Sequence, residues 1–470
     1  MPNKFYITTP IYYVNDRPHI GHAYTTLLAD VLTRFHAQRK ERTFFLVGTD
    51  EHGAKISLAA KKVGKPEKEF VDEKAEFFKN AWEKLNIKYN NFLRTTDISH
   101  IAAVQKAVNY LNENGLIYKD FYEGLYCQSC EQYKNSDDLI DGKCPDHQTT
   151  PVLLKEESYF FRLSKFEKII KEKILSGHFV ITPKERENEV LIFLKKGLKD
   201  ISISRKNVSW GISLPFDKDY TLYVWIDAFL NYLTGLGWQG DAGKKPDFFP
   251  PDIQLLGKDI LRVHATIWLA LLLALKLPLP KKFFVHGYFT VNNQKMSKSL
   301  GNVIWPEDLI AKFGVDGARY LLMSSLSYGQ DGDITWEKLI KKYNADLANG
   351  LGNLVSRIIK LKAKFKIKIQ IPKSNFENKK LEKILKEVKI KEFLEAVWEK
   401  VAWANKYIEE RRLWELVKNN PKEGKRVLLE ILSLLFEIAY LIQPVMPETS
   451  EKIFYQINTG KGEILFPRVE

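Results

Sequence analysis

The amino-acid sequence predicts an α/β protein in which one parallel sheet is split by an insertion and followed by an all-helical region. Short apolar runs alternate with stretches of helical periodicity over residues 1–115 and again over 225–290. The interval 116–224 breaks this alternation and contains every cysteine of the chain. From about residue 337 the patterns are almost only helical. Alternating strands and helices are typical of parallel sheets, whose ligands bind beyond the carboxyl ends of the strands.

The elements of this sheet can be placed in order from apolar runs and spacing. We expect a strand at 5–9, a helix at 20–35, a strand at 43–47 ending in Gly48-Thr49-Asp50, charged amphipathic helices over 54–85, a strand within 90–96, a helix at 100–114, strands at 253–256 and 281–289 with an apolar helix after Asp259 between them, and helices from 337 onward interrupted near 361–376.

Size, charge and hydropathy limit the class of protein. The chain has 470 residues, 45% of them hydrophobic, which is typical of a folded protein of several domains. The most apolar stretch, 265–275, is too short to cross a bilayer and predicts a buried helix. The chain opens directly into a strand pattern, and we expect a cytoplasmic protein. A net charge of +14 favours a polyanionic partner such as nucleic acid, or only a lysine-rich composition.

The three cysteines have the spacing of metal ligands. Cys127 and Cys130 are separated by two residues, thirteen residues follow, and Cys144 and His147 are again separated by two. Two such turns can close a tetrahedron around one Zn²⁺ and leave no position for water, which is the pattern of a structural site. The alternative, three unrelated buried cysteines and a surface histidine, requires this spacing to arise by accident. We therefore predict one structural zinc ion.

Two further segments suggest phosphate binding. Residues 19–22, His-Ile-Gly-His, open the first helix, whose free backbone N–H groups form an anion site. Gly21 would let a nucleotide approach the backbone, and both imidazoles can donate N–H groups to phosphate oxygens. Alternatively, His19 and His22 only cap and pack the helix. Residues 295–299, Lys-Met-Ser-Lys-Ser, follow the last strand and, taken alone, would be a solvated charged loop.

Taken together, 19–22 and 295–299 resemble the paired signatures of class I aminoacyl-tRNA synthetases, in order and in separation; we call them the two signature segments. The strings TTPIYYVN and GTDEHG, the cysteine-bearing insertion, the helical end and the closing LFPR are similar to the methionyl-tRNA synthetase family in particular. The resemblance covers nearly the whole chain. It implies a ligase that activates methionine with ATP to methionyl-adenylate and transfers the methionyl group to tRNA(Met).

Adenylyl transfer gives the two signature segments a physical role. The reaction passes through a five-coordinate α-phosphate with excess negative charge, which the protein must position and stabilise. The resemblance implies that His19 and His22 hold ATP from one side while Lys295 and Lys298 close over its phosphates from the other. The ATP-binding set, with Mg²⁺ accompanying ATP, comprises His19, Gly21, His22, Lys295, Ser297 and Lys298.

The resemblance also implies a methionine pocket. Asp50, at the end of the second strand, could take the α-ammonium group, and aromatic rings suit a thioether. The implied residues are Ile11, Tyr13, Asp50, Trp225, Ala228, Tyr232, Asp259, His264 and Trp268. By pattern alone the tryptophans would be core residues and Asp259 a helix cap. Val263 and Phe229 depart from some members of the family, which leaves the outline of the pocket open.

The helical region is implied to read the anticodon. Asn353 and Arg357 lie one helical turn apart, and Trp414 is on a later helix, where Leu413 replaces a frequent proline. An amide, a guanidinium group and an indole can bind the edges and faces of unstacked bases. Spacing alone would instead favour a surface pair and a core tryptophan. The chain ends soon after this region, and we expect a monomer.

These inferences divide the chain into five regions: a Rossmann-like catalytic domain in two parts, 1–115 and 225–290; a connective insertion with the zinc knuckle, 116–224; the second signature segment with a stem-contact region, 291–340; and an anticodon-binding helical domain, 341–470. Three alternatives remain at this point: a class I synthetase for another apolar amino acid, a zinc-containing RNA-binding protein without catalysis, and a simple nucleotidyltransferase. Synthetases for other apolar amino acids are expected to carry larger editing insertions than the one in this chain. A non-catalytic RNA-binding protein would not need two phosphate-binding segments. A simple nucleotidyltransferase would not need the helical region.

Overall fold

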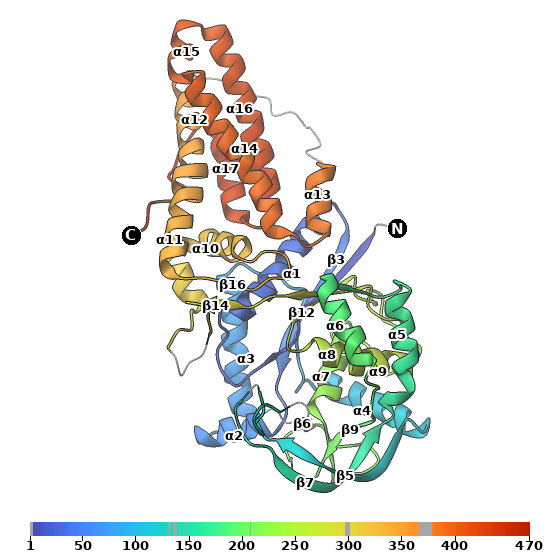
Figure 1. The fold of residues 1–470 in the computed structure, drawn as a ribbon. Coiled ribbons are helices and arrows are strands. Elements are labelled where there is room, and N and C mark those ends of the chain that lie inside the picture. Colours follow the sequence, from blue (N-terminus) through green and yellow to red (C-terminus); the bar gives the residue numbers. More distant parts are fainter. Residues whose placement is uncertain are drawn as a thin grey trace.

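The protein is extended along one axis in the computed structural model, which describes residues 3–129, 132–134, 139–145, 147–206, 208–296, 301–365 and 378–470. A bundle of long helices forms one end, a sheet covered by helices lies in the middle, and an antiparallel sheet containing β5 (Ile117–Cys127) and β7 (Val152–Phe161) forms the other end (Figure 1). Within the described residues, no helix is both long and apolar enough to cross a membrane.

The central sheet has seven strands, and every neighbouring pair in it is parallel, as the sequence predicts. Its strands are β1 (Lys4–Thr8), β2 (Tyr12–Tyr13), β3 (Arg42–Asp50), β4 (Asn91–Arg94), β8 (Val180–Thr182), β12 (Ile253–Gly257) and β13 (Lys282–His286). Leu46 of β3 pairs with both Thr8 and Asn91, so β1 and β4 flank β3 on opposite sides. On the far side of β1 follow β12, β13 and β8.

Strand alternation sends apolar side chains to two cores. Phe5 and Ile7 pack on the face covered by α1 (Ile20–Gln38) and α3 (Glu67–Lys84), whereas Tyr6 between them packs on the opposite face. That opposite face is covered by α4 (Ile98–Glu113), α7 (Val224–Thr234) and α9 (Leu269–Ala274). The helices predicted at 20–35, within 54–85, at 100–114 and after Asp259 are confirmed, with α2 (Ala54–Lys62) preceding α3.

The order of strands creates a switch point between β1 and β12. The chain leaves β1 toward β3 on one side, and β12 joins β1 on the other. Connections that run in opposite directions leave a crevice beyond the carboxyl ends of two adjacent parallel strands, where ligands bind in sheets of this kind. The N-terminus of α1 follows β1 and β2, and Gly257, Lys258 and Asp259 close β12 at the same edge.

The interval 116–224 forms a second, antiparallel sheet and also contributes to the first. The second sheet contains β5, β6 (Gln132–Lys134), β7 and β9 (Ile201–Ser202). Strand β8 lies within the same interval but pairs with β13 at the edge of the central sheet. The remaining elements here are η2 (Leu163–Phe166), α5 (Glu167–Leu175), α6 (Lys184–Leu194), β10 (Ser204–Arg205) and β11 (Thr221–Leu222).

The end of the chain is helical, as predicted, and shares a core with the sheet. One continuous apolar cluster runs from Phe5 and Leu27 through Tyr320 to Leu435 in the bundle. Three short strands, β14 (Phe289–Val291), β15 (Gln294–Lys295) and β16 (Gly332–Asp333), connect the two parts. The helices are α10 (Pro306–Ser325), α11 (Trp336–Lys342), η5 (Tyr343–Gly352), α12 (Asn353–Lys364), α13 (Lys379–Lys386), α14 (Ile390–Glu410), α15 (Leu413–Asn419), α16 (Pro421–Ile442) and α17 (Pro447–Thr459). Most of the interruption expected near 361–376 lies outside the described residues.

Candidate active site

Two histidines cap the helix that begins at the switch point. Nδ1 of His19 accepts a hydrogen bond from the backbone N–H of Gly21 at 3.0 Å, and Nδ1 of His22 accepts from the backbone N–H of His19 at 3.2 Å. Helix N-termini are normally capped by hydroxyl or carboxamide groups, so this reciprocal pair is a capping box built from imidazoles. Both bonds require an unprotonated Nδ1, which places the remaining hydrogen of each ring on Nε2.

Both rings are therefore neutral donors. Burial, and secondly the charge of Lys295, lower the pKa of His19 to about 4. Burial also lowers the pKa of His22 well below its ordinary value. The two ring centroids are 4.0 Å apart, and the His22 ring meets the edge of Tyr12 at 4.9 Å, so its orientation is fixed. At pH 7 the pair offers two Nε2–H groups at the positive end of a helix, which suits phosphate oxygens.

Gly21 allows both the cap and the approach of the second signature segment. A Cβ atom at position 21 would lie 2.7 Å from Cε1 of His19 and 4.0 Å from Cε of Met296. The first contact is too short, so any side chain here would displace the His19 ring. The second shows that Met296, more than 270 residues later in the chain, packs over the start of α1.

The first signature segment and the described part of the second, Lys295 and Met296, converge in the fold. Ile20 donates its backbone N–H to the carbonyl of Ile304 at 3.2 Å, and the Arg17 guanidinium lies 3.7 Å from the Trp305 ring centroid. Lys295 is exposed at the end of β15, close enough for its charge to lower the pKa of His19. The predicted residues Ser297 and Lys298 lie outside the described residues.

Asp50, the last residue of β3, is partly buried and begins a polar corner formed by Asp50, Glu51 and His52. The next residue, Glu51, is fully buried and accepts a bidentate pair from Arg94 at 2.7 and 2.8 Å. Hydroxyls of Thr49 and Thr96 donate to the same carboxylate. Burying a carboxylate is unfavourable unless it is paired in this way, so the corner is rigid.

A second buried network joins this corner to α7, and sequence reasoning missed it. The carboxylate of Asp227 accepts from Nδ1 of His52 at 2.6 Å and from Nε2 of His100 at 2.7 Å. Burial would raise the pKa of Asp227, but the two imidazoles outweigh it and hold the pKa below its ordinary value. The only sequence signal was an aspartate inside the apolar string YVWIDAFLNYL.

The predicted methionine-pocket residues on α7 and on the helix after β12 form one aromatic cluster. Trp225 contacts Phe229 and His264, with ring centroids 5.5 and 6.3 Å apart, and Tyr232 contacts Trp268 at 5.4 Å. Tyr232, His264 and Trp268 are buried, Ala228 is buried beside them, and Trp225 is partly exposed at the edge. His264 and Trp268 belong to a π-helical turn, η3 (His264–Trp268), between α8 (Leu261–Val263) and α9; such turns are frequent at functional sites.

Hydrogen bonds fix the polar atoms of this cluster. Nδ1 of His264 donates to the carbonyl of Ile260 at 2.8 Å, since a carbonyl can only accept. Burial lowers the pKa of His264 to about 4, so the ring is neutral and its Nε2 accepts from the Tyr232 hydroxyl at 2.9 Å. Trp268 donates to Oε1 of Gln254 at 2.8 Å, which ties the cluster to β12 at the switch point.

Replacing Tyr232 with phenylalanine is expected to leave Nε2 of His264 buried without a donor, at a cost of about 1–3 kcal/mol. If the cluster forms the methionine pocket, KM for methionine should rise as well. Tyr6→Phe is a matched control because the Tyr6 hydroxyl donates to the Tyr232 carbonyl at 2.7 Å and does not touch His264. Calorimetry and methionine-dependent kinetics on both variants check this expectation. Equal changes in KM would contradict a specific role for the Tyr232 hydroxyl.

The three other predicted pocket residues, Ile11, Tyr13 and Asp259, make contacts outside the aromatic rings. The Tyr13 hydroxyl donates to the carbonyl of His52 at 3.2 Å. Ile11 packs against Gly48, where an added Cβ would lie 3.0 Å from its Cγ2 atom. Asp259 is exposed at the end of β12, and its backbone N–H donates to the Tyr288 hydroxyl at 2.9 Å. Since Tyr288 also faces Lys295, Asp259 lies on the side of the second signature segment.

Three of the four predicted zinc ligands come together. The ligand atoms of Cys127, Cys144 and His147 all lie within 4.8 Å of one another, and Sγ of Cys144 is 3.9 Å from Nδ1 of His147. A tetrahedron with zinc–ligand bonds of ~2.0–2.3 Å has edges of about 3.3–3.8 Å. Two thiols and an imidazole are donors that zinc prefers, and they lie close enough together to hold a metal ion. Cys130, the fourth predicted ligand, lies outside the described residues.

The three predicted anticodon residues share one end of the helical bundle. Asn353 is exposed at the start of α12, and Arg357 follows one turn later. The Arg357 guanidinium lies 5.6 Å from the Trp414 ring centroid and pairs with Glu409 at 2.8 Å. Leu413 is fully buried and anchors the first turn of α15, which leaves Trp414 partly exposed.

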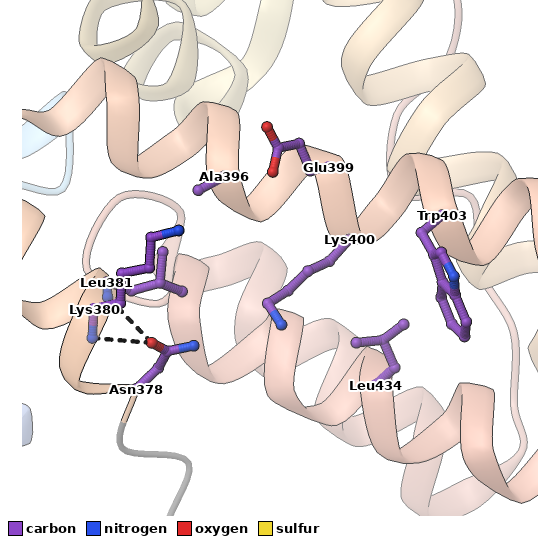
Figure 2. A pocket seen from close by; sticks show the side chains of 8 residues that line it. All are labelled: Asn378, Lys380, Leu381, Ala396, Glu399, Lys400, Trp403 and Leu434. Carbon is purple, nitrogen blue, oxygen red and sulfur yellow. Dashed lines mark hydrogen bonds between the residues drawn. The ribbon is translucent and has the colours of Figure 1, made fainter.

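A separate groove in the bundle contains none of these residues. It encloses about 390 Å³ between α13, α14 and α16, and Trp403 forms one wall beside Leu434 (Figure 2). Lys400 extends into it but pairs with Glu437 at 3.1 Å. The groove therefore combines apolar and mutually compensated charged groups and does not extend the site at the switch point.

A parallel sheet with this strand order, with residues 19–22 and the described part of the second signature segment at its switch point, is the arrangement expected of a class I aminoacyl-tRNA synthetase. The family described as tRNA synthetases class I (M) matches residues 5–150 and 135–359. The chain belongs to this methionine-specific branch of the class I synthetases.

Individual relatives of this chain are methionine–tRNA ligases as well. The methionine–tRNA ligase of Clostridium acetobutylicum is 42% identical, over 99% of this chain and 78% of that protein. The corresponding ligase of Thermotoga maritima is 41% identical, over 97% of this chain and 75% of that protein. Among solved structures, Mycobacterium tuberculosis methionyl-tRNA synthetase in complex with methionyl-adenylate matches with a TM-score of 0.90 and 33% identity, over 99% of this chain and 98% of that chain. Its free state matches with a TM-score of 0.83 and 30% identity, over 100% and 99%.

Proposed function

We propose that this protein is a methionine–tRNA ligase, which activates methionine with ATP to methionyl-adenylate, releases pyrophosphate and transfers the methionyl group to tRNA(Met). The observation that carries this is the convergence of His19, Gly21 and Met296 at the start of α1. Its likeness to a structure in complex with methionyl-adenylate supports the same reaction. His19 and His22 can cap the helix and bind phosphate at the same time, because capping uses Nδ1 of each ring and leaves each Nε2–H available.

In the proposed first step, the methionine carboxylate attacks the α-phosphate and pyrophosphate leaves. The Nε2–H groups of His19 and His22 donate hydrogen bonds to phosphate oxygens. Both imidazole rings do so in their neutral form, because burial lowers the pKa of each. Lys295 supplies positive charge from the opposite side, together with Lys298, and Ser297 adds a hydroxyl; Mg²⁺ enters with ATP. Donors placed in advance around developing charge lower the barrier without reorganisation.

For the amino acid, we propose that Asp50 binds the α-ammonium group and that the aromatic cluster binds the thioether. The buried pairs of Glu51 with Arg94 and of Asp227 with His52 hold the corner that contains Asp50. Trp225, at the exposed edge of the cluster, would contact the side chain first, with Ile11, Tyr13, Ala228, Tyr232, His264 and Trp268 completing the pocket. Asp259, at the end of β12 beside Tyr288, would complete the methionine-binding set.

The test of the proposed function is pyrophosphate exchange into ATP, measured with each amino acid in turn. We expect exchange with methionine far above that with leucine, isoleucine or valine. Homocysteine should also support exchange, since one missing methyl group changes binding by only about 1–3 kcal/mol. Exchange with another apolar amino acid in preference to methionine would contradict the assignment, and so would the absence of exchange with all of them.

We further propose that Cys127, Cys130, Cys144 and His147 hold one structural zinc ion. Purified protein should contain about one zinc per chain by elemental analysis, because a closed thiolate site binds the metal tightly. Cys144→Ser should lose the metal and destabilise the turns around this residue. The backbone N–H of Cys144 also donates to the carbonyl of Thr149. A wild-type sample free of metal, folded and fully active, would contradict this.

We propose that Asn353, Arg357 and Trp414 read the anticodon. Trp414→Ala should lower kcat/KM for tRNA charging by about ten- to a hundredfold, which corresponds to the loss of one stacked base. Pyrophosphate exchange should be unaffected, because the bundle end is remote from the signature segments (Figure 1). Trp403→Ala is the matched control: this tryptophan is 47% exposed and stacks on Tyr407. Equal losses in the two variants would show a general loss of bundle stability instead.

We propose that each region of the chain has its own task. Residues 1–115 and 225–290 would perform activation, 116–224 would form the zinc-bearing insertion, 291–340 would position the second signature segment, and 341–470 would bind tRNA(Met). We propose that the protein acts as a monomer in the cytoplasm. Sedimentation at the concentration used for kinetics tests the first point.

A further inference from the structure

The strand that carries Lys295 belongs to a small sheet with an unusual polar row. Thr290 of β14 pairs with Lys295 of β15 on one side and with Asp333 of β16 on the other. Paired residues of neighbouring strands project to the same face, so Lys295, Thr290 and Asp333 form one row across three strands. The Cα atoms of Lys295 and Asp333 are therefore only two strand spacings apart, about 10 Å across the sheet.

Asp333 fixes the hairpin that ends in Lys295. Its Oδ1 accepts from the backbone N–H of Asn293 at 2.6 Å and from the Thr290 hydroxyl at 3.1 Å, and its Oδ2 accepts from Lys338 at 2.7 Å. Asn292 and Asn293 have φ values of 54° and 58°, so they form the two-residue turn in which both residues are left-handed. Oδ1 of Asp333 therefore binds the hairpin turn, whereas Oδ2 binds Lys338.

Asp331, two residues earlier, fixes the base of the same unit. Its carboxylate accepts from the backbone N–H of Tyr288 at 2.8 Å and from Lys258 at 2.6 Å. Lys258 follows β12, and Tyr288 follows β13, so Asp331 joins the ends of two strands at the switch point. Hydrogen bonds from Lys258 and Tyr288 keep the pKa of Asp331 low in spite of its partial burial, which would raise it.

The two backbones also touch directly. A Cβ atom at Gly287 would lie 2.0 Å from the carbonyl oxygen of Gln330 and 2.5 Å from the nitrogen of Asp331. This approach is possible only for glycine. The segment before β16 therefore lies against the end of β13, and the position of Asp331 and Asp333 is set by the central sheet.

We propose that Asp331 and Asp333 are positioning residues for adenylate formation: they hold the β14–β15 hairpin so that Lys295 faces His19 across the bound phosphates. This inference rests on the proposed function and extends it to residues that do not touch the substrate. A displacement of about 1 Å in a group that stabilises the transition state can reduce the rate a hundredfold. The proposed methionine pocket is built on α7 and η3 and not on the hairpin, so KM for methionine should be insensitive to the hairpin.

The test is single-turnover adenylate formation with Asp333→Asn and Asp331→Asn, beside KM values for methionine and ATP. Each variant replaces an anionic acceptor by a neutral amide, and we expect about a ten- to hundredfold loss of rate. KM for methionine should stay within about twofold of wild type. Asp247→Asn is the matched control, because Asp247 also accepts from two cations, Lys4 and Arg42, but at the opposite edge of the sheet.

Lys338→Met distinguishes positioning from simple support of β16. It removes the exposed ion pair to Oδ2 and leaves both bonds from Oδ1 to the hairpin, so its rate should stay within about threefold of wild type. Equal losses in Lys338→Met and Asp333→Asn, or a wild-type rate in Asp333→Asn, would overturn the proposal. Should Asp333→Asn not fold, Thr290→Val removes one hairpin bond alone and should slow the step several-fold while KM for methionine is unchanged. Failure of wild-type protein to exchange pyrophosphate with methionine would instead refute the proposed function.

Discussion

Replacing His19 with asparagine is expected to lower the rate of methionyl-adenylate formation by about a hundred- to a thousandfold while the unfolding temperature stays close to that of wild type. Asparagine is among the best helix N-caps, and its side-chain oxygen can accept the Gly21 N–H that Nδ1 of His19 accepts at 3.0 Å. It cannot place a donor where the longer imidazole presents Nε2–H. Loss of one donor aimed at developing charge costs about 2.7–4 kcal/mol of barrier.

His19→Ala completes this experiment. Alanine removes both the cap and the donor, so the rate should fall as far as in His19→Asn. The free energy of unfolding should in addition fall by about 0.5–2 kcal/mol. Rapid-quench measurement of adenylate and calorimetry separate the two effects. A normal rate in His19→Asn would show that the imidazole serves only to cap α1. The pKa of His19, about 4, also predicts that its protonation does not limit the rate between pH 6 and 8.

Replacing Arg319 with methionine is expected to cause the largest loss of stability, about 3–5 kcal/mol. Arg319 is fully buried where the sheet, α10 and the bundle meet. Its guanidinium group donates to Asp30 at 2.7 Å and to carbonyls of Leu85, Asn86, Pro444 and Val445. These bonds use all five N–H groups. Methionine has a similar length but would leave a buried carboxylate and four carbonyls without this donor.

Calorimetry should also show a change in cooperativity. Because one core spans sheet and bundle, we expect wild type to unfold in one main transition, and Arg319→Met to show an earlier transition from the bundle. Arg34→Met is the matched control. Arg34 pairs with the same Asp30 at 2.8 Å, but its side chain is 23% exposed, and the loss should be about 1 kcal/mol or less. Similar calorimetric traces for the two variants would contradict the special role of Arg319.

Some site residues could be predicted because their signal is local. A glycine between two histidines at a helix start, two cysteines at Cys-x-x-Cys spacing, and lysines after the last strand each have a meaning within a few residues. The apolar alternation placed every strand of the central sheet except β2 and β8. These two have two and three residues, too short to show a period.

Other assignments needed partners from distant parts of the chain. The sequence left open whether His19 and His22 cap a helix or bind phosphate, and the structure shows that capping fixes the tautomer that phosphate binding needs. Asp227, Asp331 and Asp333 have no local signature, since their donors include His100 of α4, the residues that follow β12 and β13, and the β14–β15 turn. The contact between the Asp259 backbone and the Tyr288 hydroxyl likewise joins residues that are distant in the chain.

The sequence by itself determined the class of protein, the course of the parallel sheet and the residues of the two signature segments, because periodicity and short motifs are properties of neighbouring residues. Only the tertiary structure decided which buried charges are paired, which nitrogen of each histidine carries its hydrogen and which carboxylates hold the hairpin of Lys295. Those outcomes depend on distances of about 3 Å between groups that are far apart in the chain, and such distances are set by packing as a whole.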